Sequence, residues 1–250
     1  MRIRSLAYLA AACMACLASA MACCAATGEV LKQAEYNGTL GAQRIGLILN
    51  MQGEKVAPSR YYYLRHLTDI PLAGERNGSA FTLHEQGATM TLHFVGNGSE
   101  HGAPLDFNNS IGLEGEWNNG KTSLPVKLQG GGLSDASPPA HWYESITDQT
   151  DDVFEARAKG FCAAVAKGDS SAAAPFVHFP LRVNHGPGKH DMIGDAKQLA
   201  AQWHRLFTPA YVKRIADASP HSMPLVQGYA MLGDGLVFFS DKGVEVLNVR

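Results

Sequence analysis

Cysteine is scarce beyond the N-terminus, and this scarcity excludes a disulfide-stabilised fold. Four of the five cysteines lie within the first 24 residues, at Cys13, Cys16, Cys23 and Cys24. The fifth, Cys162, has no partner in the body of the chain, so the hydrophobic core must hold the fold together. Cys162 lies beside Phe161 and near Val165 on the apolar side of an expected helix, which favours a buried small hydrophobe over a nucleophile.

Charge and long hydrophobic runs are also in short supply. Charged residues make up 18% of the chain and hydrophobic residues 46%, which is typical of a globular protein. Net charge is −2, and it becomes about −4 if a cleaved leader removes the two positive charges of Arg2 and Arg4. No basic field attracts nucleic acid or an anionic membrane surface. After residue 26 no apolar run approaches the roughly 18 to 20 residues of a membrane-spanning helix.

Signature motifs of common enzyme classes are missing as well. We find neither a Gly-x-Ser-x-Gly elbow nor a His-Glu-x-x-His zinc motif, and we interpret the chain as having no glycine-rich phosphate loop. A Ser-His-Asp set could be assembled from scattered residues in any chain of this size, so it carries no weight. We therefore expect no cofactor and assign no catalytic residue.

The N-terminus has the three parts of a secretory leader. Met1–Arg4 supplies positive charge, Leu6–Leu17 supplies a short apolar segment, and small residues follow. Cleavage is expected after Ala22 or Ala26, so residues 1–26 are assigned to a signal peptide. This pattern predicts a protein exported to the periplasm or cell envelope.

A lipid anchor is the alternative fate of this segment. The stretch Ala20-Met21-Ala22-Cys23 resembles a bacterial lipobox, in which the cysteine is acylated and becomes the mature N-terminus. The match is imperfect, because Ala20 replaces the usual leucine and Met21 replaces a small residue. Lipidation at Cys23 would tether the protein to a membrane without making it span.

Residues 30–130 have the alternating pattern of β-strands. The alternating apolar residues are Ile45, Leu47, Leu49 and Met51; Phe81 and Leu83; Met90, Leu92 and Phe94; Ile111, Leu113 and Trp117; and Leu124, Val126 and Leu128. Period two places one face of each strand on a core and the other toward water. Seven or eight short antiparallel strands, counting Tyr61–Leu64 and Ile70–Leu72, predict an all-β sandwich or a small up-and-down barrel.

Asn-Gly pairs are expected at the turns between these strands. The four pairs begin at Asn37, Asn77, Asn97 and Asn119. Tight hairpin turns favour this pair because both central positions need positive φ. The first three pairs also match the N-glycosylation sequon, but the leader looks bacterial, so we interpret them as turns.

Residues 131–150 are rich in glycine, serine and proline and predict a linker. Beyond it, spacings of three and four residues predict helices over Asp151–Lys167 and Asp195–Ala218, with a restart at Thr208-Pro209. The stretch Asn184–Asp195 is expected to be a loop. Three strands are expected, at Phe176–Val183, Gly228–Ser240 and Gly243–Val249. Because Pro180 interrupts the first of these, we place that strand at a sheet edge. The order predicts an α+β domain over residues 151–250.

This order, with Phe-Pro-Leu-Arg-Val at 179–183 and Gly-Asp-Gly-Leu-Val-Phe at 233–238, resembles the nuclear-transport-factor-2-like (cystatin-like) cone family. The resemblance implies a curved antiparallel sheet around helices, often with a pocket at the mouth of the cone. The family usually has three strands after the helices, and two are predicted here. Its enzymes tend to place a buried acid with a Tyr or His in the pocket. No such pair can be aligned, so no catalytic residue is carried over.

Two groups of residues are candidates for binding. Tyr61 and Tyr63 should share one face of a strand, which leaves at least one tyrosine of the Tyr61–Tyr63 run facing solvent, and Arg65 follows. Tyr and Arg are the residue types that anchor protein interfaces, although aromatic residues also simply favour strands. Trp203 and His204 lie near the expected mouth of the cone, with Trp203 also on the apolar stripe of its helix.

The histidines raise the question of a metal site. His185, His190 and Asp191 lie in one stretch and could ligate zinc. Their spacing is not that of a helix face, so we interpret the stretch as a solvated loop and predict no metal. His84 and His93 lie on neighbouring expected strands, where they could pair across a hairpin.

These observations favour an exported envelope protein that binds a protein partner or a small ligand without catalysis, for example an inhibitor or immunity protein. The alternative is a small-molecule enzyme that uses acid–base residues in the C-terminal cone, with His204, His178 and Asp234 as the first suspects.

Overall fold

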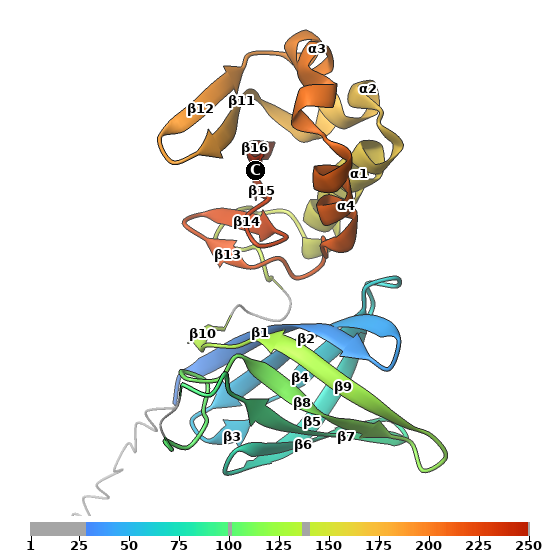
Figure 1. Ribbon diagram of the computed structural model, residues 1–250, viewed down its shortest axis with the longest axis vertical. Helices are drawn as coiled ribbons and strands as arrows, with labels where there is room; N and C mark the ends of the chain where they lie inside the picture. Colours follow the sequence, from blue (N-terminus) through green and yellow to red (C-terminus); the bar gives the residue numbers. More distant parts are fainter. Residues whose placement is uncertain (1–28, 100–101, 137–140, 250) are drawn as a thin grey trace, which may run out of the picture.

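The computed structural model describes residues 29–99, 102–136 and 141–249. It contains an N-terminal β-barrel followed by a C-terminal region of helices and a sheet (Figure 1). The predicted signal peptide, Cys23 and residues 137–140 of the predicted linker lie outside the described residues.

Eight antiparallel strands form the barrel. They are β1 (Leu31–Leu40), β2 (Gln43–Gln52), β4 (Ser59–Tyr63), β5 (Asp69–Asn77), β6 (Ala80–Glu85), β7 (Ala88–Val95), β8 (Gly112–Asn118) and β9 (Ser123–Gly130). Strand β1 pairs with both β9 and β2, so the sheet closes on itself. Two short strands, β3 (Lys55–Val56) and β10 (Ser134–Asp135), extend it. The barrel alternative of the sequence prediction is confirmed, and closure removes the exposed edges that a sandwich would leave.

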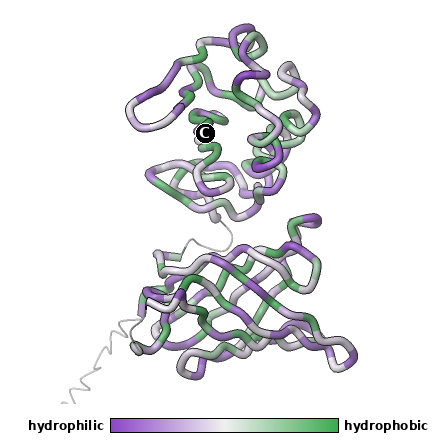
Figure 2. Tube along the Cα trace, in the orientation of Figure 1, coloured by the Kyte–Doolittle hydropathy of each residue, from purple (hydrophilic) through white to green (hydrophobic). Residues whose placement is uncertain are grey.

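Aromatic side chains fill the interior of the barrel. Phe81, Phe94 and Phe107 meet edge to face, with ring centroids 4.9 to 5.8 Å apart. All three are buried, together with aliphatic residues of the neighbouring strands such as Leu72, Leu83 and Leu92. The alternation is visible along the strands in Figure 2. The barrel is therefore a packed core and not a ligand cup.

Strand β2 departs from the expected one-sided burial. Its inward residues, such as Leu47, are buried in the barrel, and its outward residues Gly46, Ile48 and Asn50 are buried too. Ile48 packs into the core of the C-terminal region. The C-terminal region, which lies over the β1–β2 side of the barrel (Figure 1), covers Ile48, whereas Tyr62 covers Gly46 and Asn50 bonds to Pro58 and Ser59.

One Asn-Gly prediction is wrong. Asn37-Gly38 lies inside β1, whereas the other three pairs lie at turns, where Gly78, Gly98 and Gly120 have φ of +59°, +85° and +81°. A Cβ on Gly38 would lie 2.0 Å from the carbonyl oxygen of Lys127 on β9. Glycine is needed here because two strands approach closely, and not because the chain turns.

Over the described residues 141–249, the C-terminal region contains four α-helices, one short 3₁₀-helix and a mixed six-stranded sheet. The helical elements are α1 (Asp151–Lys167), α2 (Ser170–Ala173), η1 (Ala174–Phe176), α3 (Ala196–Leu206) and α4 (Pro209–Asp217). The sheet order is β12 (Lys189–Ile193), β11 (Val177–Gly186), β16 (Gly243–Asn248), β15 (Val237–Ser240), β14 (Tyr229–Leu232) and β13 (Leu225–Val226). The predicted helix starts are confirmed, since Asp195 and Thr208 accept hydrogen bonds from Gln198 and Tyr211 as N-caps.

Three local predictions for this region are wrong. Strand β11 is internal and not an edge, because it lies between β12 and β16. Pro180 is accommodated there because the pairing with β16 is interrupted around it and resumes at Arg182. The expected loop over 184–195 contains β12, which forms a hairpin with β11. The expected strand over 228–240 is two strands, because Gly233, Asp234 and Gly235 all have positive φ and turn the chain between β14 and β15.

Two separate hydrophobic clusters hold the structure. Every buried residue of the first lies between Ala34 and Leu128. In the second, all but Ile48 lie from Trp142 onward. Trp142, inside the predicted linker, belongs with the second cluster, and its ring N–H donates to the carbonyl of Met223 at 2.8 Å.

The close approach at Gly38 gives the first prediction. Gly38→Ala should lower the free energy of unfolding by about 1 to 3 kcal/mol, because the added methyl group forces β1 away from β9. The neighbouring exposed variant Asn37→Ala should change it by less than about 0.5 kcal/mol. Urea unfolding followed by circular dichroism measures both. Equal stability of the two variants would contradict the close packing of β1 on β9.

Candidate functional site

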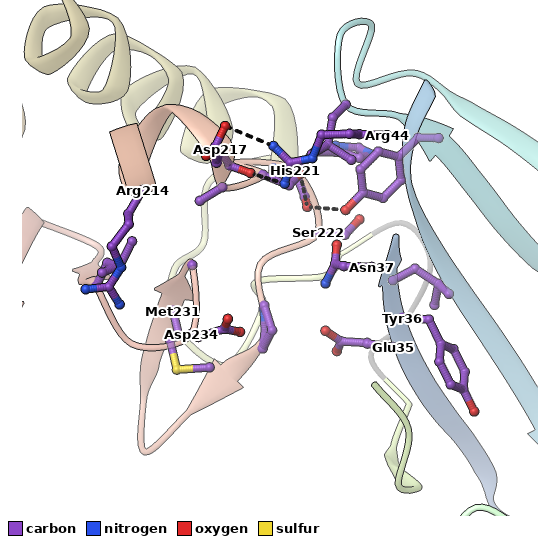
Figure 3. Close-up of a pocket in the computed structure, with 18 residues that line it drawn as sticks. Glu35, Tyr36, Asn37, Arg44, Arg214, Asp217, His221, Ser222, Met231 and Asp234 are labelled. Carbon is purple, nitrogen blue, oxygen red and sulfur yellow. Dashed lines mark hydrogen bonds and ion pairs between the residues drawn. The ribbon is translucent and has the colours of Figure 1, made fainter. Parts of the chain in front are cut away.

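A cleft of about 300 Å³ lies where the barrel meets the C-terminal region (Figure 3). The barrel wall carries Glu35, Asn37 and Arg44 on β1 and β2. The opposite wall carries Arg214 of α4 and Asp234 of the β14–β15 turn. In the view of Figure 3, the carboxyl groups of Glu35 and Asp234 point toward each other. The cleft is polar and combines both signs of charge.

One end of the cleft is closed by His221, in the segment between α4 and β13. Its Nδ1 lies 2.7 Å from Oε2 of Glu155 on α1, and its Nε2 lies 3.0 Å from Oδ1 of Asp69 on β5. Ionised carboxylates only accept hydrogen bonds, so both ring nitrogens must donate and the ring is an imidazolium. Burial alone would lower the pKa of His221, but the two carboxylates outweigh it and raise the pKa to about 9.

Glu155 is the buried centre of this arrangement, at 3% exposure. Its Oε1 accepts from the Tyr143 hydroxyl at 3.1 Å and from the Ser222 backbone N–H at 2.8 Å. Its Oε2 accepts from His221 and from Nζ of Lys159 at 3.3 Å. Burial would raise the pKa of Glu155, but His221 and the other donors hold it below its ordinary value. The carboxylate therefore stays charged, and every lone pair has a partner.

The barrel contributes a second cation to the same junction. Nε of Arg60 lies 3.1 Å from Oδ2 of Asp69, and its NH2 group donates to the Ser222 hydroxyl at 3.1 Å. The guanidinium also lies 4.9 Å from the ring of Trp142. Tyr62 stands edge-on to the His221 ring at 4.6 Å and donates its hydroxyl to the His221 carbonyl at 3.1 Å. The two parts of the chain are joined by a network of charge-assisted hydrogen bonds.

The cleft is also bridged by an exposed pair, which lies beside His221 in the view of Figure 3. Arg44 of β2 reaches Asp217 at the end of α4, donating to its Oδ1 at 3.3 Å and to its backbone carbonyl at 2.5 Å (Figure 3). About half of each side chain is exposed, so this pair stabilises the junction weakly. Its role is to bound the cleft.

Glu35 is the carboxyl group of the cleft whose pKa is shifted toward neutral pH. Burial raises its pKa to about 7, against the hydrogen bond from Gln33 at 3.0 Å and the positive charge of Arg60. Near neutral pH this carboxyl is present in both protonation states. It is the residue in the cleft best suited to exchange a proton with a ligand.

The tyrosine cluster predicted as a partner surface faces inward. Tyr61 is 1% exposed in the barrel core, where its hydroxyl donates to Glu85 at 2.9 Å. Tyr63 is half-buried against the same core, and Tyr62 is covered by the C-terminal region. Of the three tyrosines, Tyr63 alone keeps partial exposure to solvent, because the second region covers Tyr62 on the outer face of β4. Arg65 is exposed and lies 6.0 Å from the ring of Tyr63.

The structure separates the other sequence candidates. Trp203 is core, stacked on Phe207 at 4.1 Å, whereas His204 is exposed on α3. His178 lies 3.4 Å from Glu245. Asp234 alone reaches the cleft. The candidates therefore do not form one site.

The histidine stretch is exposed to solvent, as predicted, but it forms a strand hairpin and not a loop. His185 and Arg205 both contact Asp191, each at 2.9 Å. Over the parts of the chain that the structure describes, no three His, Cys, Asp or Glu residues gather as a metal site. His84 and His93 do not face each other, since His84 is opposite Thr89 and His93 is opposite Ala80.

One motif was overlooked in the sequence. The string from Gly115 to Thr122, Gly-Glu-Trp-Asn-Asn-Gly-Lys-Thr, has the spacing of a phosphate-binding loop. It forms the β8–β9 hairpin, with no helix after it. The backbone N–H groups of Lys121 and Thr122 donate to the side chain of Asn119, at 3.0 and 2.8 Å. They are not free to bind phosphate, so the match is accidental.

The His221 network carries no sequence signal that pattern reading could use. His221 lies in an irregular Ser-Pro-His-Ser segment, and its two acidic partners are 66 and 152 residues away. Glu155 occupies a position on the buried face of α1 that the heptad-like spacing assigns to apolar residues. The charge of Glu155 on an otherwise apolar helix face is the one sequence feature that indicates this network.

No known protein family, curated protein or solved structure matches this chain. Among the residues that the structure covers, none forms a helix long and apolar enough to cross a bilayer.

The raised pKa of Glu35 gives the second prediction. The folded protein holds this proton more tightly than the unfolded chain, so its stabilising effect is present below about pH 4.5 and is lost as pH rises to about 7. Glu35→Gln removes the desolvated charge and should raise the free energy of unfolding by about 1 to 3 kcal/mol near pH 8, with little change near pH 4.

Urea unfolding at both pH values measures this difference. The matched control is Glu75→Gln, an exposed glutamate on β5. If Glu35→Gln lowers stability near pH 8, then the carboxylate is stabilised in place and the desolvation argument is wrong.

Proposed function

We propose that this protein is an exported envelope protein of two domains that binds a small polar ligand in the cleft between them. The barrel would be the first domain, and the helix-plus-sheet region, a cone-like α+β unit, the second. The separation of the two hydrophobic clusters supports the division. Four strands, β13 to β16, follow the helices, where the cone family that the sequence resembles usually has three.

The observation that carries the binding proposal is the composition of the cleft. Its walls come from both parts of the chain and carry carboxyl, guanidinium and amide groups within about 300 Å³. Pockets of this size and polarity fit a small molecule with several hydrogen-bonding groups better than a protein segment. The packed interior of the barrel offers no competing site in the described residues. Burial of Tyr61 also weakens the case for a protein partner at the tyrosine cluster.

The cleft geometry supports binding over catalysis. His221 is the imidazole at the cleft, and both of its nitrogens are committed to carboxylates, so it has no lone pair with which to act as a base. An acid–base enzyme is the second candidate, and one observation favours it: the pKa of Glu35 is raised to about 7 by burial. A single tuned carboxyl without a second catalytic group is the weaker basis.

Export and anchoring follow from the leader. The positive start, the short apolar segment and the small residues before Thr27 support a cleaved signal peptide and an envelope location. Acylation of Cys23 is the alternative, and it would hold the same binding domains on a membrane surface.

The third prediction tests the cleft directly. The full chain is expressed with its leader in a bacterium, purified from the envelope and dialysed against a small-molecule extract of the same envelope. Native mass spectrometry should then detect a bound compound. Asn37→Trp, which fills the cleft with a bulky ring, should lose it, because Asn37 lies on the cleft wall. Thr91→Trp, on the exposed outer face of β7, should keep it.

Several outcomes discriminate between the alternatives. A bound compound with equal occupancy in wild type and Asn37→Trp, or no bound compound at all, would contradict the proposed site. A compound that is chemically converted by wild type and not by Glu35→Gln would favour the enzyme. The intact mass of the same preparation decides between cleavage and acylation at Cys23.

A further inference from the structure

His221 is shared between the two parts of the chain. One ring nitrogen is bonded to Glu155 on α1, within the C-terminal region, and the other to Asp69 on β5 of the barrel. The side chain is 15% exposed, so water is a poor substitute for either partner. Both bonds can exist together only while the ring carries two protons.

We propose that His221 is a protonation-dependent latch that holds the barrel against the C-terminal region and so controls the opening of the cleft. This inference rests on the proposed function only in taking the cleft to be a ligand-binding site. The latch itself is defined by contacts that involve no ligand. It assigns a regulatory role to a group that the binding site does not otherwise use.

The surroundings of His221 determine which bond fails when the ring loses a proton. The side chain of Glu155 is 4% exposed. Its carboxylate binds the His221 ring and also accepts hydrogen bonds from Tyr143 and Lys159. Asp69 is 42% exposed and has Arg60 as a second partner. The remaining proton therefore stays on Nδ1 toward the buried Glu155, where an unpaired charge costs most. The bond to Asp69 is lost, and this is the bond that crosses the junction.

The charges that face the ring come from every element packed against it. Asp69 on β5 and Glu155 on α1 favour the imidazolium, while Arg60 on β4 and Lys159 on α1 oppose it. Two further titratable groups lie near it: Tyr62, whose ring meets the imidazole, and Glu35 across the cleft. The carboxylates are the direct partners and dominate, so the charged ring is the ground state of the closed junction.

The direction of the pH dependence follows. Because the folded pKa of His221 is raised from 6.5 to about 9, the latch is fully engaged below pH 6.5 and is released as pH rises through about 9. Release leaves the barrel's links from Arg60 to Ser222, from Arg44 to Asp217 and from the Tyr62 hydroxyl to the His221 carbonyl. The cleft should then open by a movement of the two regions apart.

Distance measurements between the two regions test the latch without any ligand. Nitroxide labels are placed at the exposed positions Glu75 on β5 and Lys197 on α3, in the full chain with every native cysteine replaced by alanine. Double electron–electron resonance should show a narrow distribution near pH 6 and a shift to longer, broader distances near about pH 10. His221→Gln should give the long, broad distribution at both pH values, and the exposed control His204→Gln should follow wild type.

Asp69→Ala keeps the experiment decisive if His221→Gln does not fold, because it removes the partly exposed barrel partner together with its acceptor oxygens. It should open the junction at both pH values while circular dichroism stays native. An unchanged, narrow distribution in Asp69→Ala near pH 6, or in wild type at both pH values, would overturn the latch. Loss of ligand binding in the cleft assay with an intact latch would instead contradict the proposed function alone.

Discussion

The structure depends on a carboxylate that is kept charged inside a hydrophobic core. Glu155 lies on the buried face of α1 among aromatic and aliphatic side chains, where an isolated charge would be strongly unfavourable. It is tolerated because His221 supplies a counter-charge and Ser222, Tyr143 and Lys159 supply further donors. The segment between α4 and β13 has no regular secondary structure. It is held in place because His221 and Ser222, which lie in it, both bind Glu155. That segment in turn presents the second nitrogen of His221 to the barrel.

The relative placement of barrel and C-terminal region follows from this chain of contacts. Apolar packing across the junction is limited, with Ile48 the one barrel residue in the second hydrophobic cluster. Polar contacts through Asp69, Arg60 and Tyr62 supply the rest. An interface of this kind is directional and holds one orientation, but it depends on protonation and leaves space where side chains do not interlock. The cleft with Glu35 on its wall is that space.

Much of the architecture could be predicted from local pattern. Alternation along β6 and β7 and the periodicity of α1, α3 and α4 correspond to burial, which the sequence encodes residue by residue. Errors arose where a contact distant in sequence overrode the local signal. Gly38 serves strand packing against Lys127 and not a turn. Pro180 is accommodated in an internal strand because the pairing of β11 with β16 is interrupted around it. The outer face of β2 is buried because another part of the chain covers it.

The candidate site was harder to predict for the same reason. Tyr61 and Arg65 have the composition of a partner surface, but a residue type does not say which face of a barrel strand is covered. Asp69, Glu155 and His221 share neither spacing nor motif, and only the tertiary fold brings them together. His204 was predicted from its place near the expected mouth of the cone and Asp234 from its acid–base chemistry, and of the two only Asp234 lines the cleft.

The protonation state of His221 is the property on which the latch and the closed cleft both depend. Nitrogen-15 NMR of the imidazole in the full chain, titrated with pH and assigned by comparison with His221→Gln, reads it directly. Two protonated ring nitrogens near neutral pH, with loss of a proton at about pH 9, are expected. A ring that is already neutral at pH 7 would show that the carboxylates do not hold the second proton, and the proposed coupling between barrel and C-terminal region would be wrong.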